Sequence, residues 1–184
     1  MPFNSKSMIG FQEREEEAAK ATRIPEDTYI LEITDGEVFD SNGVPRLRLG
    51  HKTISAKTDG QVGRFHTEFL GWYGSETSNS TKPIEERTRN LRKMTKERLQ
   101  GYLKSLQDSP TSDQSLGESL DEAISALDAT DDPTDVSEIM EAIGAMLVGQ
   151  LITGQVKYSK TGDFVNLYAN TYDESIGAAD AVAV

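Results

Sequence analysis

Segments that alternate apolar and polar residues occur in two groups, three before a helical region and two after it. Alternation with a period of two residues predicts half-buried β-strands. The chain is therefore expected to build one antiparallel sheet from strands that lie far apart in the sequence. The predicted strands cover residues 28–39, 45–55, 64–74, 148–159 and 163–172.

Turn signals separate the strands within each group. Asn42-Gly43, between the first and second strands, tolerates the positive φ angles of a two-residue hairpin turn. Residues 58–63 predict a second turn, and residues 160–163 predict the turn of the closing hairpin. Gly50 indicates a bulge that bends the second strand.

The helical region contains a basic helix followed by an acidic insert. Apolar residues at helical spacing predict the basic helix over residues 84–106, and seven Lys or Arg occupy its other faces. Residues 108–135 contain nine Asp or Glu and no Lys or Arg. A short amphipathic helix is predicted inside this insert, and a further helix over residues 136–147. The apolar face of the short helix comprises Leu116, Leu120, Ile124 and Leu127.

The order of elements, β-β-β-α-(α)-β-β, predicts a mainly β fold with helices, namely a five-stranded OB-like antiparallel barrel. The long helix and the acidic insert 108–135 would lie between strands three and four. Another small α+β fold with one antiparallel sheet is the main alternative. We expect one domain over residues 24–172, a flexible N-terminal arm over 1–23 and a flexible tail over 173–184.

Charge is distributed unevenly along the chain, which has 184 residues and a net charge of −12. Residues 44–104 contain 13 Lys or Arg and 6 Asp or Glu, whereas the other residues contain 6 and 25. Polyanion binding depends on the local field, which the total charge hides. The basic middle is therefore compatible either with nucleic-acid binding or with an ordinary solvated face.

Residues needed for several common chemistries do not occur in the sequence. There is no cysteine, which excludes a disulfide framework and a cysteine nucleophile. His51 and His66 lack metal-motif spacing, and no phosphate-binding glycine motif occurs. We expect no catalytic site, no cofactor and no metal. No run approaches the roughly 18 apolar residues of a membrane helix, and no signal-peptide pattern is present, so a cytoplasmic protein without membrane contact is expected.

The closing hairpin is expected to carry two aromatic rings on its solvent side. Phe164 and Tyr168 alternate with Val165, Leu167 and Ala169, which would fill the core. Flat rings beside cations are what single-strand binding requires, because rings stack on unpaired bases while cations contact phosphates. Packing of both rings under the helix or the insert is the alternative.

A binding surface on the second and third strands is predicted from the same alternation, since OB folds bind single strands there. Leu47 and Leu49 would face the core, and Arg46 and Arg48 the solvent. In the third strand, Phe65, Thr67 and Phe69 would form the core face, opposite Arg64, His66 and Glu68. Trp72 and Tyr73 would extend the surface, or Trp72 would plug a barrel end. The predicted nucleic-acid-binding residues are Arg46, Arg48, Lys52, Arg64, His66, Trp72, Tyr73, Arg92, Lys157, Lys160, Phe164 and Tyr168.

Five stretches of the sequence resemble a group of phage-encoded proteins of similar size. They are IPEDTYILEI, SNGVPRLRL, GRFHTEFLGW, RLQGYLKSL and VGQLITGQVKYSKTGDFVNLY, and the resemblance covers residues 24–107 and 147–172. The group looks like single-stranded-DNA-binding proteins of phage replication and recombination modules. The resemblance implies an OB-type fold, no enzymatic activity, and action beside recombinases, helicases or polymerases in the cytoplasm of a bacterial host cell.

The sequence departs from the pattern of this group in two places. Glu26-Asp27 replaces a small turn after the opening proline, and the C-terminus lacks an acidic tip that ends in Phe. The resemblance therefore does not extend to recruitment of partners through the tail. The acidic insert is a candidate for that role, or for competition with DNA over the basic residues.

Sequence-independent binding of single-stranded DNA in phage replication or recombination is the predicted function. An acidic interaction or inhibitor module of a phage that binds a host protein is the first alternative, and an OB-like virion component is the second. An uncovered edge along residues 29–39 would additionally pair two chains into a homo-oligomer.

Overall fold

The computed structural model describes residues 23–76 and 79–177. These residues form one five-stranded antiparallel sheet and three helices, a mixed α/β fold. The strands are β1 (Thr28–Asp40), β2 (Pro45–Ala56), β3 (Phe65–Gly71), β4 (Leu151–Tyr158) and β5 (Val165–Asn170). The helices are α2 (Ile84–Leu106), α3 (Gln114–Ala129) and α4 (Pro133–Leu147).

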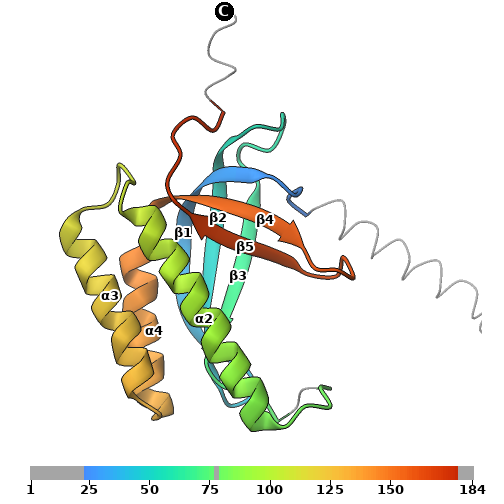
Figure 1. Cartoon of the computed structure of the whole chain (residues 1–184), viewed down its shortest axis with the longest axis vertical. Coiled ribbons are helices and arrows are strands. Elements are labelled where there is room, and N and C mark those ends of the chain that lie inside the picture. Colours follow the sequence, from blue (N-terminus) through green and yellow to red (C-terminus); the bar gives the residue numbers. More distant parts are fainter. Residues whose placement is uncertain (1–22, 77–78, 178–184) are drawn as a thin grey trace, which may run out of the picture.

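The strand order in the sheet is β3-β2-β1-β4-β5. Figure 1 shows β4 and β5 running across the direction of β1, β2 and β3, so the sheet is strongly bent. Within the described residues the two edge strands, β3 and β5, share no ladder of hydrogen bonds, and the sheet is not closed into a barrel. We call the gap between these two edges the seam.

The turn and bulge signals of the sequence correspond to real features of the backbone. Asn42 and Gly43 have φ angles of 58° and 81°, which confirms the predicted hairpin turn. Ile33 pairs with His51 and Asp35 pairs with Gly50, so Thr34 is an extra residue. The bulge at Gly50 thus lies in the facing strand β1, and a second register shift, between Ile30 and Leu31, leaves Ile54 of β2 as an extra residue. Before the bulge at Thr34, the odd-numbered residues of β1 face the core. After it, the even-numbered residues do.

Helix boundaries follow from local capping. The bounds of α2 match the prediction, and α3 begins after Asp113, whose side chain accepts a hydrogen bond from Leu116 N. Helix α4 begins three residues before the predicted start. Its cap is Asp132, which accepts from two backbone N–H groups, and Pro133 suits the first helical turn.

Strand β1 is the centre of the sheet and not an edge. Its residues 29–32 pair with β4 as well as with β2, which contradicts an uncovered edge along the whole of this strand. The chain after β5 is packed as far as Ile176, which is buried and whose carbonyl accepts a hydrogen bond from Ser55. The predicted arm and the rest of the tail, residues 1–22 and 178–184, lie outside the described residues.

One core joins the three helices to the sheet. Helix α4 crosses β1 so closely that a Cβ added to Gly144 would lie 2.9 Å from the Gly36 carbonyl oxygen. Helix α2 approaches β5 in the same way, because a Cβ on Gly101 would lie 2.7 Å from the Ala169 oxygen. Absence of a side chain at these two positions sets how near the helices lie to the sheet.

We predict that Gly144→Ala lowers the free energy of unfolding by about 1–3 kcal/mol, because the added methyl group meets backbone that must shift. Gly117→Ala in α3 is the matched control, since its Cβ would lie 3.9 Å from Leu103. That change should raise stability by about 0.5–1 kcal/mol, because alanine is the better helix former. Urea unfolding measures both, and two changes of the same sign would contradict the close crossing.

Candidate nucleic-acid interface

Three phenylalanine rings and three cations share the outer face of β1, β2 and β3. The register places Phe69 opposite Arg48 and Phe65 opposite Lys52, so rings and cations sit side by side along the ladder. Phe65 is 65% exposed and Phe69 is 51% exposed. The rings of Phe39 and Phe69 meet edge to face at 5.8 Å. We call this surface the outer patch; its residues are Phe39, Arg46, Arg48, Lys52, Phe65 and Phe69.

The predicted faces of β3 were wrong. Phe65, Thr67 and Phe69 face solvent, whereas His66 and Glu68 face the interior together with Leu70. The reason is that α2 provides Tyr102 and Arg98 as polar partners for Glu68, so this part of the interior is not apolar. Arg64, predicted on the same face as His66, lies just before β3, is half-buried and donates to the Gln61 side chain at 3.1 Å.

One feature of the sequence could have identified Phe65 and Phe69 as exposed. Leu70 and Trp72 share the parity of His66 and are both buried, so extending the alternation to the end of the segment would have reversed the assignment. Phe39 was not predicted because the bulge in β1 shifts its parity. Arg46 and Arg48 face outward and Leu47 and Leu49 inward, as predicted.

The cations of the outer patch differ in how far neighbouring acids neutralise them. Arg48 forms ion pairs of 2.7 Å with both Asp35 and Glu37 of β1. Arg46 and Lys52 have no ion pair with the described residues. Arg46 and Lys52 are therefore the cations best able to contact an incoming anion, and Arg48 mainly orders the carboxylates beside it.

The closing hairpin supplies a second group of exposed residues. Phe164 is 70% exposed and Tyr168 also faces solvent, whereas Leu167 and Ala169 are buried, as predicted. Lys157 lies 5.9 Å from the centre of the Tyr168 ring. We call this group the hairpin cluster; its residues are Lys157, Lys160, Phe164 and Tyr168.

Three predicted residues belong elsewhere. Trp72 is 0% exposed, so its ring is part of the core and cannot stack on a base in this structure. Arg92 packs over the rings of Trp72 and Tyr73, with centroid distances of 5.4 Å and 5.2 Å, and pairs with Asp131 at 2.8 Å. Tyr73 and Arg92 thus line a groove along α2 and do not belong to the outer patch.

A buried polar cluster fills the seam. Arg98 of α2 donates to the Leu167 carbonyl of β5 and lies 3.7 Å from the Glu68 carboxylate of β3. Tyr102 donates to Glu68 at 2.6 Å, so His51 must donate to the Tyr102 oxygen, 2.8 Å away, from Nε2. The Arg98 guanidinium also stacks on the Tyr168 ring at 3.8 Å. The outer patch and the hairpin cluster therefore flank the same seam.

Burial shifts the pKa values of Glu68, Tyr102 and the two histidines toward their neutral forms. It raises the pKa of Glu68 to about 7, although Tyr102 and Arg98 act in the opposite direction. Burial, helped by His66, lowers the pKa of His51 to about 3. Burial and then Arg98 lower the pKa of His66 to about 4. The His51 ring is completely enclosed in this structure, and its Nε2 is held by Tyr102.

Residues 23–76 and 79–177 hold no group of three or more His, Cys, Asp or Glu arranged to bind a metal ion. None of the helices α2, α3 and α4 combines the length and hydrophobicity needed to cross a bilayer. Comparison with protein-family models finds no match to this chain, and comparison with curated proteins finds no significant match.

We predict that stability falls as the pH decreases from 6.5 toward 4, because both histidines have folded-state pKa values below 6.5 and must bind protons to unfold. Each contributes about 1.4 kcal/mol per pH unit in this range. Glu68 opposes them: its raised pKa gives stability that is complete below 4.5 and is lost as the pH rises through 7.

His51→Leu should reduce the slope of stability against pH by about 1.4 kcal/mol per unit between pH 6.5 and 4.5. Thr53→Val is the matched control, since it changes a buried neighbour on β2 without removing a titrating group. Urea unfolding at several pH values gives the slopes. A His51→Leu curve parallel to the wild-type curve would contradict the assignment.

Proposed function

We propose that the protein binds single-stranded DNA through the outer patch and the hairpin cluster, on a bent sheet of OB type that is open along one seam. Two features support the OB assignment. A meander of three strands is followed by a helical region, α2 to α4, and a closing hairpin, and β1 pairs with both β2 and β4. In OB folds the surface of strands two and three binds oligonucleotides. The outer patch lies on that surface.

The exposure of Phe65 and Phe69 beside cations carries this proposal. Large aromatic rings normally contribute to a core, and clustered exposed ones mark a surface that binds something. Every base has a flat face, so a row of rings binds single strands with little dependence on sequence. Arg46 and Lys52, on the neighbouring strand, are placed to contact the phosphates between stacked bases.

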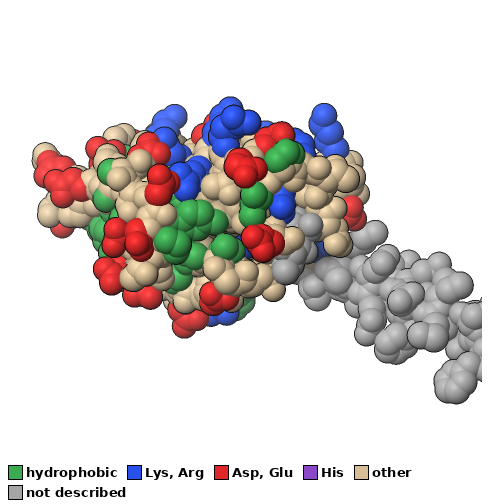
Figure 2. Space-filling model, turned by 90° about the horizontal axis from the view of Figure 1, so that it is seen from below, with side chains coloured by type: hydrophobic (Ala, Val, Ile, Leu, Met, Phe, Trp, Pro, Cys, Tyr) green, Lys and Arg blue, Asp and Glu red, His purple; other side chains and the backbone are tan. Residues whose placement is uncertain are grey.

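The negative total charge is compatible with this function because the charges are distributed unevenly over the surface (Figure 2). Figure 2 shows Lys and Arg side chains gathered along one edge of the molecule, while Asp and Glu side chains lie over much of the rest of that face. A strand approaching the cations displaces condensed counterions, so binding should weaken as salt increases. The acidic surface would repel a strand from other orientations and favour one path.

This activity fits a replication or recombination role in which the protein protects transient single strands and works beside recombinases, helicases or polymerases. No catalytic step is part of the proposal. The alternative is an acidic interaction module, which the nine acids of residues 108–135 favour. Such a module would bind a basic protein and ignore oligonucleotides.

The rings are tested by Phe65→Ala and Phe69→Ala, each of which should weaken binding of a labelled poly-dT oligonucleotide by about 1–3 kcal/mol, the usual contribution of one stacked base. Val148→Ala is the control, because it removes an exposed apolar side chain at the end of α4. Fluorescence anisotropy gives the affinities. Equal affinities for all three variants and wild type would place the DNA elsewhere or exclude it.

The cations are tested by the salt dependence. The double variant Arg46→Ala/Lys52→Ala should reduce the slope of log affinity against log salt by about 1.4, roughly 0.7 for each phosphate of a single strand that the variant no longer neutralises. Lys82→Ala/Lys104→Ala removes the same charge from the two ends of α2 and should leave the slope nearly unchanged. Identical slopes for the two double variants would show that only total charge matters.

A further inference from the structure

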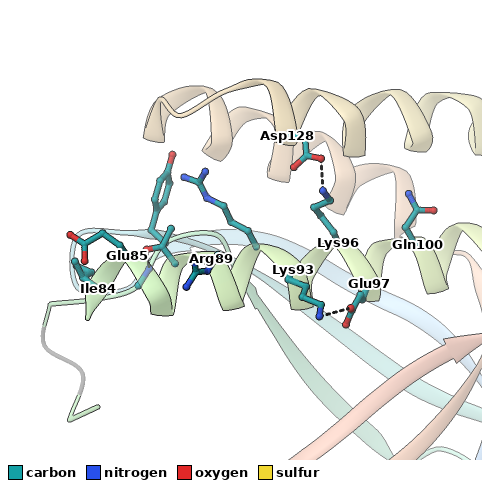
Figure 3. A pocket seen from close by; sticks show the side chains of 12 residues that line it. Ile84, Glu85, Arg89, Lys93, Lys96, Glu97, Gln100 and Asp128 are labelled. Atoms are coloured by element: carbon teal, nitrogen blue, oxygen red, sulfur yellow. Dashed lines mark hydrogen bonds and ion pairs between the residues drawn. The ribbon is translucent and has the colours of Figure 1, made fainter. Parts of the chain in front are cut away.

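A groove of about 1040 Å³ lies along α2, on the side of that helix near α3. Four cations of α2 line it, namely Arg89, Arg92, Lys93 and Lys96, with Tyr73 and Ile84 as apolar contacts. Figure 3 shows Lys96 and Gln100 projecting toward α3, whereas Lys93 and Glu97 project away from it. The groove thus combines an aromatic ring with a row of cations, as the outer patch does.

Carboxylates from the same chain already occupy part of this groove. Asp128, in the last turn of α3, pairs with Lys96, and Asp131 pairs with Arg92 at 2.8 Å. The Tyr73 hydroxyl donates to the Asp131 carbonyl at 2.8 Å. Both acids belong to the end of α3 and the turn into α4, so this segment places negative charges along α2 much as the phosphates of a strand would.

These ion pairs are weak enough to be exchanged for others. The Asp131 side chain is 86% exposed, and exposed pairs of this kind contribute about 0.2–1 kcal/mol each. A polyanion gains additional free energy by releasing its own counterions, which an intramolecular carboxylate does not. Neither acid caps a helix, since the cap of α4 is Asp132. Asp128 and Asp131 can therefore break their ion pairs with α2 without loss of the α4 cap.

The groove continues from the proposed DNA-binding surface. Tyr73 and Gly74, which line it, follow Phe69 by only a few residues at the end of β3. Gly71 lies between them, opposite Arg46 in the register and in reach of Leu91 of α2. A strand that leaves the outer patch past Phe69 therefore arrives at the cations of α2.

We infer that the α2 groove is a second phosphate-binding subsite for the same DNA strand, and that Asp128 and Asp131 compete with the strand for it. The inference rests on the proposed function and adds a length dependence to it. Short oligonucleotides bind the outer patch alone. Longer ones displace the two carboxylates and extend along α2, contacting Lys96, Arg92, Lys93 and Arg89.

The test compares Asp128→Asn/Asp131→Asn with wild type on dT oligonucleotides of about 6 and about 16 nucleotides, lengths that span the site sizes of OB folds. The variant should bind the longer oligonucleotide about 2- to 30-fold more tightly, the equivalent of two exposed ion pairs, and the shorter one equally. Glu122→Gln/Glu138→Gln is the matched control, since it removes two exposed carboxylates from α3 and α4 that form no ion pair with the described residues.

A reciprocal variant tests the cations. Arg89→Ala/Lys93→Ala should weaken binding of the longer oligonucleotide and leave the shorter one unchanged. If Asp128→Asn/Asp131→Asn behaves like its charge-matched control while both oligonucleotides bind, the second subsite is wrong and the outer patch stands. If wild type and every variant bind neither oligonucleotide, the proposed function itself is wrong.

Discussion

The contact between Arg98 and the two edge strands is the interaction on which the rest of the structure depends. No hydrogen-bonded ladder joins β3 to β5 in the described residues, and α2 bridges them through Glu68, Leu167 and the Tyr168 ring. Removing one member of a buried pair costs about 3–5 kcal/mol, because the other charge is left uncompensated. This bridge therefore holds the outer patch and the hairpin cluster on either side of one seam.

Local features of the fold could be predicted from the sequence. The Asn42-Gly43 turn, the faces of β2 and the bounds of α2 each depend on a few neighbouring residues, and the structure has them as expected. The faces of β3 could not be predicted locally. Glu68 is acceptable inside because α2 supplies Arg98 and Tyr102, some thirty residues later in the chain. An open seam in place of a closed barrel likewise depends on long-range contacts.

The faces on which the candidate-site residues lie were predicted correctly where simple alternation holds and wrongly where it does not. Arg46, Arg48, Phe164 and Tyr168 lie on outer faces because simple alternation holds in their strands. Phe39 was missed because a bulge changes the alternation, and Trp72 was misplaced because α2 covers the end of β3. Arg92 pairs with Asp131 and so joins the basic helix to the acidic insert. The sequence shows that these two segments carry opposite charges, but not that they touch.

The central position of β1 has a consequence for the order of folding. Residues 28–32 pair with residues 151–155, so the chain must close a very long loop before its first strand has both neighbours. Contacts of this range slow folding, because chain entropy is lost before the pairing compensates for it. On the ribosome, the first hairpin emerges long before β4 and presents an unpaired edge during that interval. Synthesis of the last quarter of the chain thus decides when this protein stops being prone to aggregation.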